Sequence, residues 1–158
     1  MVHYVKGNLL DSKCDYICHQ VNCQGAMNSG IAKQIRDRYP RVYESYKHFV
    51  DYHNRHEEGL LGKILISNIN SPTRVINMFA QDMYGRDRKR YTSYDAFANC
   101  LEEIDLHVAS SRTIGFPKYI GCGLGGGNWT AISAMIEEIL GRTHDVYIYE
   151  YDETIDDD

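Results

Sequence analysis

Two loops rich in small residues carry the parts of this chain that could do chemistry. The first follows an apolar stretch, Tyr16 to Val21, and leads into a helical pattern that begins at Ile31. A strand, a loop of small residues and a helix N-terminus in this order can hold an anion, because the first backbone N–H groups of the helix are free and its dipole favours negative charge. The same order also occurs in plain connecting loops, so both interpretations stay open at this point.

His19 and Asn22 are the candidate catalytic residues of the first loop. His19 shares a strand face with Ile17 and Val21, three residues before Asn22. A histidine there could transfer a proton near neutral pH, and the Asn22 amide could orient a sugar or a water molecule. A histidine on an apolar face is more often a core residue with a satisfied hydrogen bond, and the sequence does not decide between the two roles.

The second loop is Gly121–Gly127, which contains five glycines in seven residues and precedes Asn128, a good helix N-cap. It contains the spacing GxGxxG, but no acidic residue follows at the offset that a dinucleotide-binding site requires. Two glycine loops that each lead into a helix suggest a ligand with more than one phosphate.

Composition limits the class of protein. The chain has 158 residues, 43% hydrophobic and 25% charged, which predicts one globular domain. Its net charge of −5 argues against general nucleic-acid binding, although a local basic patch is compatible with it. Five cysteines without a CxxC pair indicate reduced thiols and a cytoplasmic protein without a metal site. We expect no signal peptide and no membrane segment.

Hydrophobic periodicity predicts an α/β fold with three layers, α/β/α, around a central mixed six-stranded sheet. One domain is expected over residues 1–152, followed by an acidic tail at 153–158. The helix that begins near residue 93 is expected to start with a capping box formed by Thr92 and Asp95. Strands are predicted at 2–5, 16–21, 62–69, 74–79, 112–116 and 145–151, and helices at 31–39, 40–53, 93–108 and 129–140.

The segment 81–92 is a second kind of candidate. It contains four basic and two acidic residues, one glycine and two tyrosines, and it follows a buried strand. Ligand sites of α/β proteins lie at such strand ends. The segment is therefore either a solvated charge run or a mobile flap whose Arg or Tyr side chains cover an anionic ligand.

The chain resembles the macrodomains, a family that recognises ADP-ribose. The resemblance covers nearly the whole chain and is closest to the ADP-ribose 1″-phosphate phosphatase branch. It is carried by residues 4–10, the first loop at 19–32, Gly62-Lys63, the second loop at 120–129, and 147–149 of the last strand.

The resemblance implies a role for individual residues and no cofactor. Asn8, Leu9 and Tyr149 would lie at the adenine, Gly30, Ile31 and Ala32 would offer N–H groups to the diphosphate, Asn22 and Gln81 would lie at the distal ribose, and Gly121, Cys122, Gly123, Leu124, Gly125 and Gly126 would wrap the phosphates and that ribose. His19 matches a histidine that is catalytic in the phosphatase branch.

At three positions this sequence differs from other macrodomain branches, and these differences limit which catalytic mechanisms the resemblance implies. One ADP-ribosyl-removing branch has a lysine where this chain has Gln81 and an aspartate where it has Gly125. Another branch has an aspartate where this chain has Ile31-Ala32. The mechanisms of those two branches are therefore not expected here.

Three functions remain open. The first is hydrolysis of an ADP-ribose derivative, with removal of the 1″-phosphate ahead of removal of ADP-ribose from modified protein or nucleic acid. The second is a non-catalytic reader of ADP-ribose or of an ADP-ribosylated macromolecule. The third is an unrelated nucleotide-binding protein.

Overall fold

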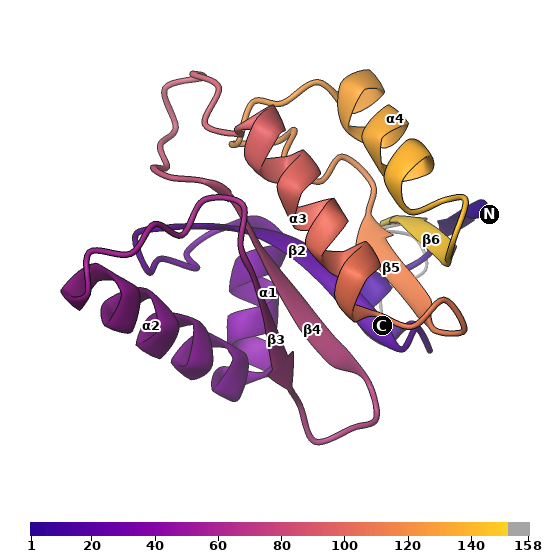
Figure 1. The fold of residues 1–158 in the computed structure, drawn as a ribbon, viewed down its shortest axis with the longest axis horizontal. Helices are drawn as coiled ribbons and strands as arrows, with labels where there is room; N and C mark the ends of the chain where they lie inside the picture. Colours follow the sequence, from indigo (N-terminus) through magenta and orange to yellow (C-terminus); the bar gives the residue numbers. More distant parts are fainter. Residues whose placement is uncertain (152–158) are drawn as a thin grey trace.

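The computed structural model describes residues 1–151, so the predicted acidic tail at 153–158 lies outside the described residues. The chain forms a six-stranded sheet in the order β1-β6-β5-β2-β4-β3 (Figure 1). All neighbouring strands are parallel except β3, which pairs antiparallel with β4. The sheet is therefore mixed, as predicted. Because five strands are parallel, their carboxyl ends meet at one edge of the sheet.

The predicted order of elements is confirmed, and their ends differ by a few residues. The strands are β1 (Val2–Lys6), β2 (Tyr16–Asn22), β3 (Ile64–Asn68), β4 (Arg74–Gln81), β5 (Thr113–Pro117) and β6 (Asp145–Glu150); the helices are α1 (Gly30–Arg38), α2 (Pro40–Arg55), α3 (Tyr94–His107) and α4 (Trp129–Ile139), with a short 3-10 helix η1 (Leu9–Asp11) after β1. Among residues 1–151, no helix is long and apolar enough to cross a membrane, and no cluster of His, Cys, Asp and Glu could hold a metal ion.

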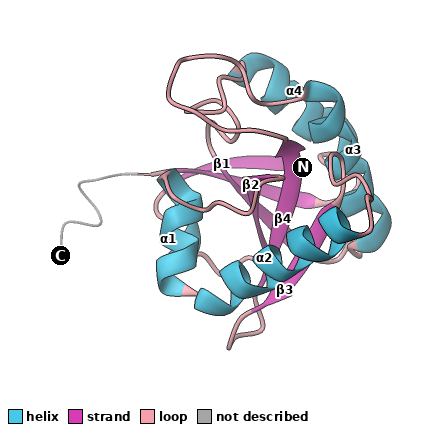
Figure 2. Ribbon diagram, turned by 90° about the vertical axis from the view of Figure 1, so that its left-hand side faces the viewer, coloured by secondary structure: helices cyan, strands magenta, loops and turns pink. Residues whose placement is uncertain are grey.

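Helices α1 and α2 cover one face of the sheet, and α3 and α4 cover the other (Figure 2). The three predicted layers are thus present, with one apolar cluster on each side of the sheet. Alternation along β2 explains the division, because Ile17 and Val21 belong to the cluster under α1 and α2 whereas Cys18 belongs to the other.

The predicted capping box at Thr92 is wrong. Helix α3 begins one residue later, and the Ser93 side chain is its N-cap, accepting a hydrogen bond from the Ala96 N–H. Thr92 is 2% exposed and forms an isolated antiparallel bridge with Gln81. The hydroxyl of Thr92 is therefore available for a different contact, which belongs to the site described below.

His19 lies in the core between β2 and β4. Its side chain is 0% exposed, and its Nε2 lies 2.6 Å from the Oδ1 of Asn77, its register partner on β4. Asn77 in turn donates to the backbone oxygen of Leu65 and to the Oγ of Ser67. Burial lowers the pKa of His19 to about 4, because a charged imidazole would lose its hydration there.

This burial predicts acid sensitivity that depends on His19. In the unfolded chain a histidine titrates near pH 6.5, so between about pH 6.5 and pH 4 the unfolded state binds a proton that the folded state does not. The free energy of unfolding therefore falls as the pH drops through this window, by on the order of 3 kcal/mol from this group.

The check is a series of thermal melts of the wild type and His19→Gln at pH values from 7.5 to 4. Glutamine keeps a donor for Asn77 and cannot take up the proton. The melting temperature of His19→Gln should fall less steeply with acidification than that of the wild type. Parallel curves would show that His19 is not buried in its neutral form.

Candidate functional site

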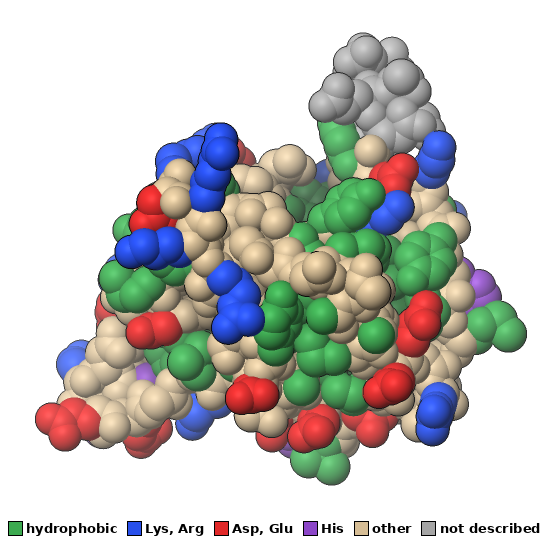
Figure 3. All heavy atoms as spheres, turned by 90° about the horizontal axis from the view of Figure 1, so that it is seen from above, with side chains coloured by type: hydrophobic (Ala, Val, Ile, Leu, Met, Phe, Trp, Pro, Cys, Tyr) green, Lys and Arg blue, Asp and Glu red, His purple; other side chains and the backbone are tan. Residues whose placement is uncertain are grey.

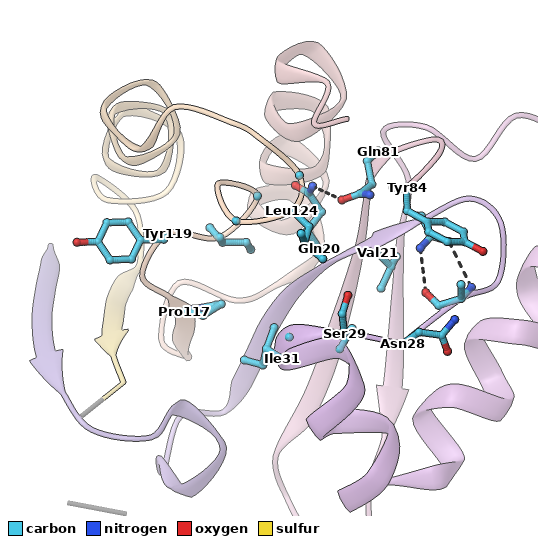
Figure 4. Close-up of a pocket in the computed structure, with 18 of the residues that line it drawn as sticks. Gln20, Val21, Asn28, Ser29, Ile31, Gln81, Tyr84, Pro117, Tyr119 and Leu124 are labelled. Atoms are coloured by element: carbon cyan, nitrogen blue, oxygen red, sulfur yellow. Dashed lines mark hydrogen bonds between the residues drawn. The ribbon is translucent and has the colours of Figure 1, made fainter. Parts of the chain in front are cut away.

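A cavity of about 790 Å³ opens at the carboxyl ends of β5, β2 and β4. Four segments line it: the end of β2 with the first loop, the start of α1, the chain after β4, and the chain after β5. The lining residues are 20–22, 26, 28–32, 81, 84–86, 117–121 and 123–125. Tyr84 and Asn28 lie on one side of the cavity, and Tyr119 lies on the opposite side (Figure 4).

Asn22 shapes the first loop from within. Its Oδ1 accepts hydrogen bonds from the backbone N–H groups of Gln24 and Ala26 at 3.0 and 3.3 Å, and its Nδ2 donates to the Ala26 oxygen. The buried Tyr46 hydroxyl lies 2.8 Å from the same Oδ1 and 2.6 Å from the Asn22 backbone oxygen. Asn22 lines the cavity, yet its acceptor oxygen is fully used in holding the loop.

The N-terminus of α1 faces the cavity without a cap. Its N-cap residue Ser29 makes no side-chain hydrogen bond to the helix, although serine is a favourable capping residue. In contrast, Ser93 and Asn128 cap α3 and α4 with their side chains. The first-turn N–H groups of α1 are consequently left for a ligand or water, next to Gly30, Ile31 and Ala32 of the cavity wall.

Most glycines of the second loop are required by close packing. A Cβ on Gly125 would lie 2.6 Å from the Thr92 Oγ1 and 2.7 Å from the Gly121 oxygen. Gly126 has φ +73°, and a Cβ there would lie 2.7 Å from the backbone oxygen of Lys89. These positions exclude any side chain because the chain after β4 lies directly against the loop.

Gly123 is different, because no atom of the described residues lies within 4 Å of the Cβ that it lacks, and its φ is not in the positive range. It lines the cavity. The fold therefore does not explain why a glycine stands there. A ligand that closely approaches the backbone would explain it.

A cluster of neutral polar groups closes the cavity beside the end of β4. The Nε2 of Gln20 donates to Gln81 Oε1 at 2.7 Å and to Thr92 Oγ1 at 2.8 Å (Figure 4 shows the pair of glutamines). The Thr92 hydroxyl donates to the Gly121 oxygen at 2.7 Å. The Oε1 of Gln20 is buried and has no hydrogen-bond partner among the described residues. Sequence reasoning missed Gln20 and Thr92, since nothing in their local sequence marks them.

The cavity is suited to an anion. Among the described lining residues there is no aspartate or glutamate, and the two charged side chains are Lys118 and Arg86. The Lys118 ammonium lies 2.6 Å from a carboxylate oxygen of Glu150. Arg86 is exposed and forms no ion pair or hydrogen bond within residues 1–151.

A family model described as Macro domain matches residues 18–136, about three quarters of the chain. The chain belongs to the macrodomain family. The match includes both glycine loops and all of the cavity lining.

Relatives of this macrodomain carry different enzyme names. A DNA ADP-ribosyl glycohydrolase of Mycobacterium tuberculosis is 26% identical over 151 residues, 92% of this chain and 40% of that protein. The macrodomain thus spans about two fifths of the length of those relatives. An ADP-ribose 1″-phosphate phosphatase of Saccharomyces cerevisiae is 33% identical over 88 residues, 53% of this chain and 48% of that protein. A solved structure from Bacteroides thetaiotaomicron superposes with a TM-score of 0.79 at 28% identity, covering 95% of this chain and 98% of its own.

The macrodomain brings most of the predicted site residues to one cavity. Those that line it are Asn22, Gly30, Ile31, Ala32, Gln81, Gly121, Gly123, Leu124 and Gly125. Those that do not are Asn8, Leu9, His19, Cys122, Gly126 and Tyr149. Leu9 is buried, and the Asn8 side chain caps η1 by accepting from the Leu10 N–H at 2.9 Å. The segment 81–92 contributes Tyr84 and Arg86 to the lining, as expected for a flap.

Of the two predicted catalytic residues, Asn22 lines the cavity and His19 does not. His19 has no exposed surface, its ring lies against Asn77 and it does not line the cavity. A group with a pKa near 4 is also a poor general acid near neutral pH. His19 is close to the first loop in sequence, but the strand alternation points its side chain under α1 and α2.

The packing of the second loop predicts different costs for two neighbouring glycines. Gly125→Ala should lower the free energy of unfolding by roughly 1–3 kcal/mol, because its Cβ would overlap Thr92 and the Gly121 backbone. Gly123→Ala should change it by no more than about 0.5–1 kcal/mol, since its Cβ enters open space. Thermal melts without ligand measure both. Equal destabilisation would contradict the packing assigned to this loop.

Proposed function

We propose that this macrodomain binds the ADP-ribose part of a derivative substituted at the distal ribose and hydrolyses that derivative, with the 1″-phosphate ester as the leading substrate. The observation that carries the proposal is the cavity itself, in which an uncapped helix N-terminus and the open backbone at Gly123 share one chamber, with no carboxylate among the lining residues of 1–151. A diphosphate needs such a chamber, since backbone N–H groups bind its oxygens and no negative side chain opposes it.

The order of the strands supports the direction in which the ligand would lie. Along the sheet edge, the order is β1, β6, β5, β2 and β4. Asn8 follows β1, Tyr149 lies in β6, the second glycine loop follows β5, the first loop follows β2 and Gln81 ends β4. Along the edge, the residues that the resemblance assigns to adenine therefore come first, the two loops assigned to the phosphates and the distal ribose come next, and Gln81, assigned to the distal ribose, comes last.

The hydrolytic step would depend on positioning and electrostatics. Water attacks the phosphorus, the bond from phosphorus to the 1″ oxygen breaks, and that oxygen takes up a proton to leave the ribose hydroxyl. Phosphoryl transfer proceeds through a loose transition state and requires little covalent help from the protein. Backbone N–H groups of the two loops would stabilise the phosphate oxygens, and Gln20 and Gln81 would hold the ribose hydroxyls or the water.

A second candidate is a reader that binds ADP-ribose without turnover. One observation favours it: no His, Asp, Glu or Cys is among the described lining residues, so the side chains that most often transfer protons near neutral pH are missing from the wall. Removal of ADP-ribose from modified nucleic acid, as the name of the mycobacterial relative indicates for that protein, is a further form of the hydrolase proposal.

Binding is tested by calorimetry with ADP-ribose and AMP. ADP-ribose should bind at one site with a micromolar dissociation constant, on the order of −8 kcal/mol. AMP should bind at least about tenfold weaker, because it cannot reach both glycine loops. Gly123→Val should abolish ADP-ribose binding without changing the melting temperature. The valine side chain would extend into the space proposed for the phosphates, and no atom of the described residues lies within 4 Å of its Cβ. Equal affinity for the two nucleotides would exclude the two-loop site.

Turnover separates the enzyme from the reader. Phosphate release from ADP-ribose 1″-phosphate is measured with the wild type and with His19→Gln. We expect turnover by the wild type, and turnover within about threefold for the folded variant, because His19 does not reach the cavity. A loss of the 10²–10⁴-fold size expected for a general acid or base would return His19 to the mechanism. Tight ADP-ribose binding with no product from any substituted ligand would establish the reader.

A further inference from the structure

The chain after β4 places positive charge at one end of the cavity. Residues 82–91, here called the flap, contain Arg86, Arg88, Lys89 and Arg90 against Asp82 and Asp87. Figure 3 views the molecule from the side of the flap and shows Lys and Arg side chains gathered at its left, where the flap lies in Figure 1. The flap is therefore locally positive, although the whole chain has a net charge of −5.

The basic residues of the flap differ in the contacts that they make. The guanidinium of Arg90 lies over the Tyr94 ring at 4.7 Å, and Lys89 lies 3.7 Å from Asp87, which also accepts a hydrogen bond from Tyr91. These contacts belong to the flap itself and to the start of α3. Among the four, Arg86 alone lines the cavity, and within residues 1–151 no ion pair or hydrogen bond holds its guanidinium.

Arg86 stands at the β4 end of the cavity, beside Tyr84 and Gly85. The other polar groups of that end, Gln20 and Gln81, are neutral and hydrogen-bonded to each other. At the β5 end, the other lining cation, Lys118, is neutralised by Glu150. The unneutralised positive charge therefore lies beyond the two glycine loops, displaced from the diphosphate toward the place where the proposed function puts the distal ribose.

We propose that Arg86 is the specificity-determining residue that recognises a phosphate group attached to the distal ribose side of ADP-ribose. The inference rests on the proposed function, since it uses the direction of the ligand along the sheet edge. A guanidinium presents paired N–H donors that match two phosphate oxygens, which a lysine ammonium or an amide cannot do. Plain ADP-ribose has only hydroxyl groups at this end and would leave the guanidinium in water.

Two sources could supply that phosphate. One is the phosphomonoester of ADP-ribose 1″-phosphate, and the other is a phosphodiester next to an ADP-ribosylated nucleotide. The chemistry that Arg86 recognises is the same in both. They differ in charge and in what lies beyond the phosphate, so separate ligands can distinguish them.

The experiment compares three ligands on four proteins. The ligands are ADP-ribose, ADP-ribose 1″-phosphate and a short single-stranded oligonucleotide with ADP-ribose on one base. The proteins are the wild type, Arg86→Gln, Arg86→Lys and the matched control Lys89→Gln, which removes a flap cation that does not line the cavity. Affinity is measured by competition against a fluorescent ADP-ribose probe, with product quantified in the same samples and melting temperatures recorded.

The wild type should bind at least one phosphate-bearing ligand about tenfold more tightly than ADP-ribose, as a charge-assisted bidentate contact allows. Arg86→Gln should remove that preference while changing plain ADP-ribose affinity less than twofold. Arg86→Lys should keep part of it, and Lys89→Gln should keep nearly all of it. A preference for the monoester alone or for the oligonucleotide alone supports the proposal and names the source.

Three results would overturn this inference alone, and a fourth would overturn the proposed function with it. If the wild type binds plain ADP-ribose as tightly as both phosphate-bearing ligands, Arg86 selects nothing, although ADP-ribose recognition stands. If Arg86→Gln weakens all three ligands equally, Arg86 binds the diphosphate instead. If Lys89→Gln loses the preference as fully as Arg86→Gln, the effect is the field of the whole flap. Absence of any ADP-ribose binding by the folded wild type would refute the proposed function together with this inference.

Discussion

Contacts between the base of the flap and the second glycine loop hold the cavity together. The N–H groups of Tyr91 and Thr92 donate to the Gly125 oxygen at 2.7 and 2.9 Å, and the Thr92 hydroxyl donates to the Gly121 oxygen. This spacing leaves no room for a Cβ at Gly125 or Gly126. Two segments about thirty residues apart in the sequence thus form one wall, and the glycines that look like a ligand motif are needed first for this contact.

The elements and their order could be predicted because the signals are local. Hydrophobic periodicity and the turn residues identify six strands and four helices, and the two glycine loops lie where strands end. The Gln20–Gln81–Thr92 cluster could not be predicted in this way. It depends on the parallel pairing of β2 with β4 and on the bridge from Gln81 to Thr92, and both are tertiary contacts.

His19 illustrates the limit of proximity in sequence. His19 lies in β2, the strand that leads into the first loop. Neighbouring residues of a strand point to opposite faces, so Gln20 reaches the cavity and His19 reaches the core. The hydrogen bond to Asn77 and the contacts of Asn77 with β3 then fix it there. Burial makes the neutral imidazole the stable form, and this suits packing between β2 and β4 better than proton transfer to a ligand.

The charged side chains of the cavity, Lys118 and Arg86, lie at its two ends, here called the rim, whereas the wall between them is neutral. The wall offers backbone N–H groups and neutral amides. In the proposed function these groups would act on any nucleotide diphosphate of suitable length and would therefore discriminate little. Under the proposed function, the side chains at the rim would distinguish ligands of one family, because they would contact the part of the ligand that varies. Lys118 pairs with Glu150, whereas Arg86 has no ion pair within the described part of the chain, so the two ends of the same cavity offer an anion unequal attraction. Selectivity in this macrodomain should therefore lie in the flap, where a single substitution changes the preferred substituent without disturbing the two glycine loops.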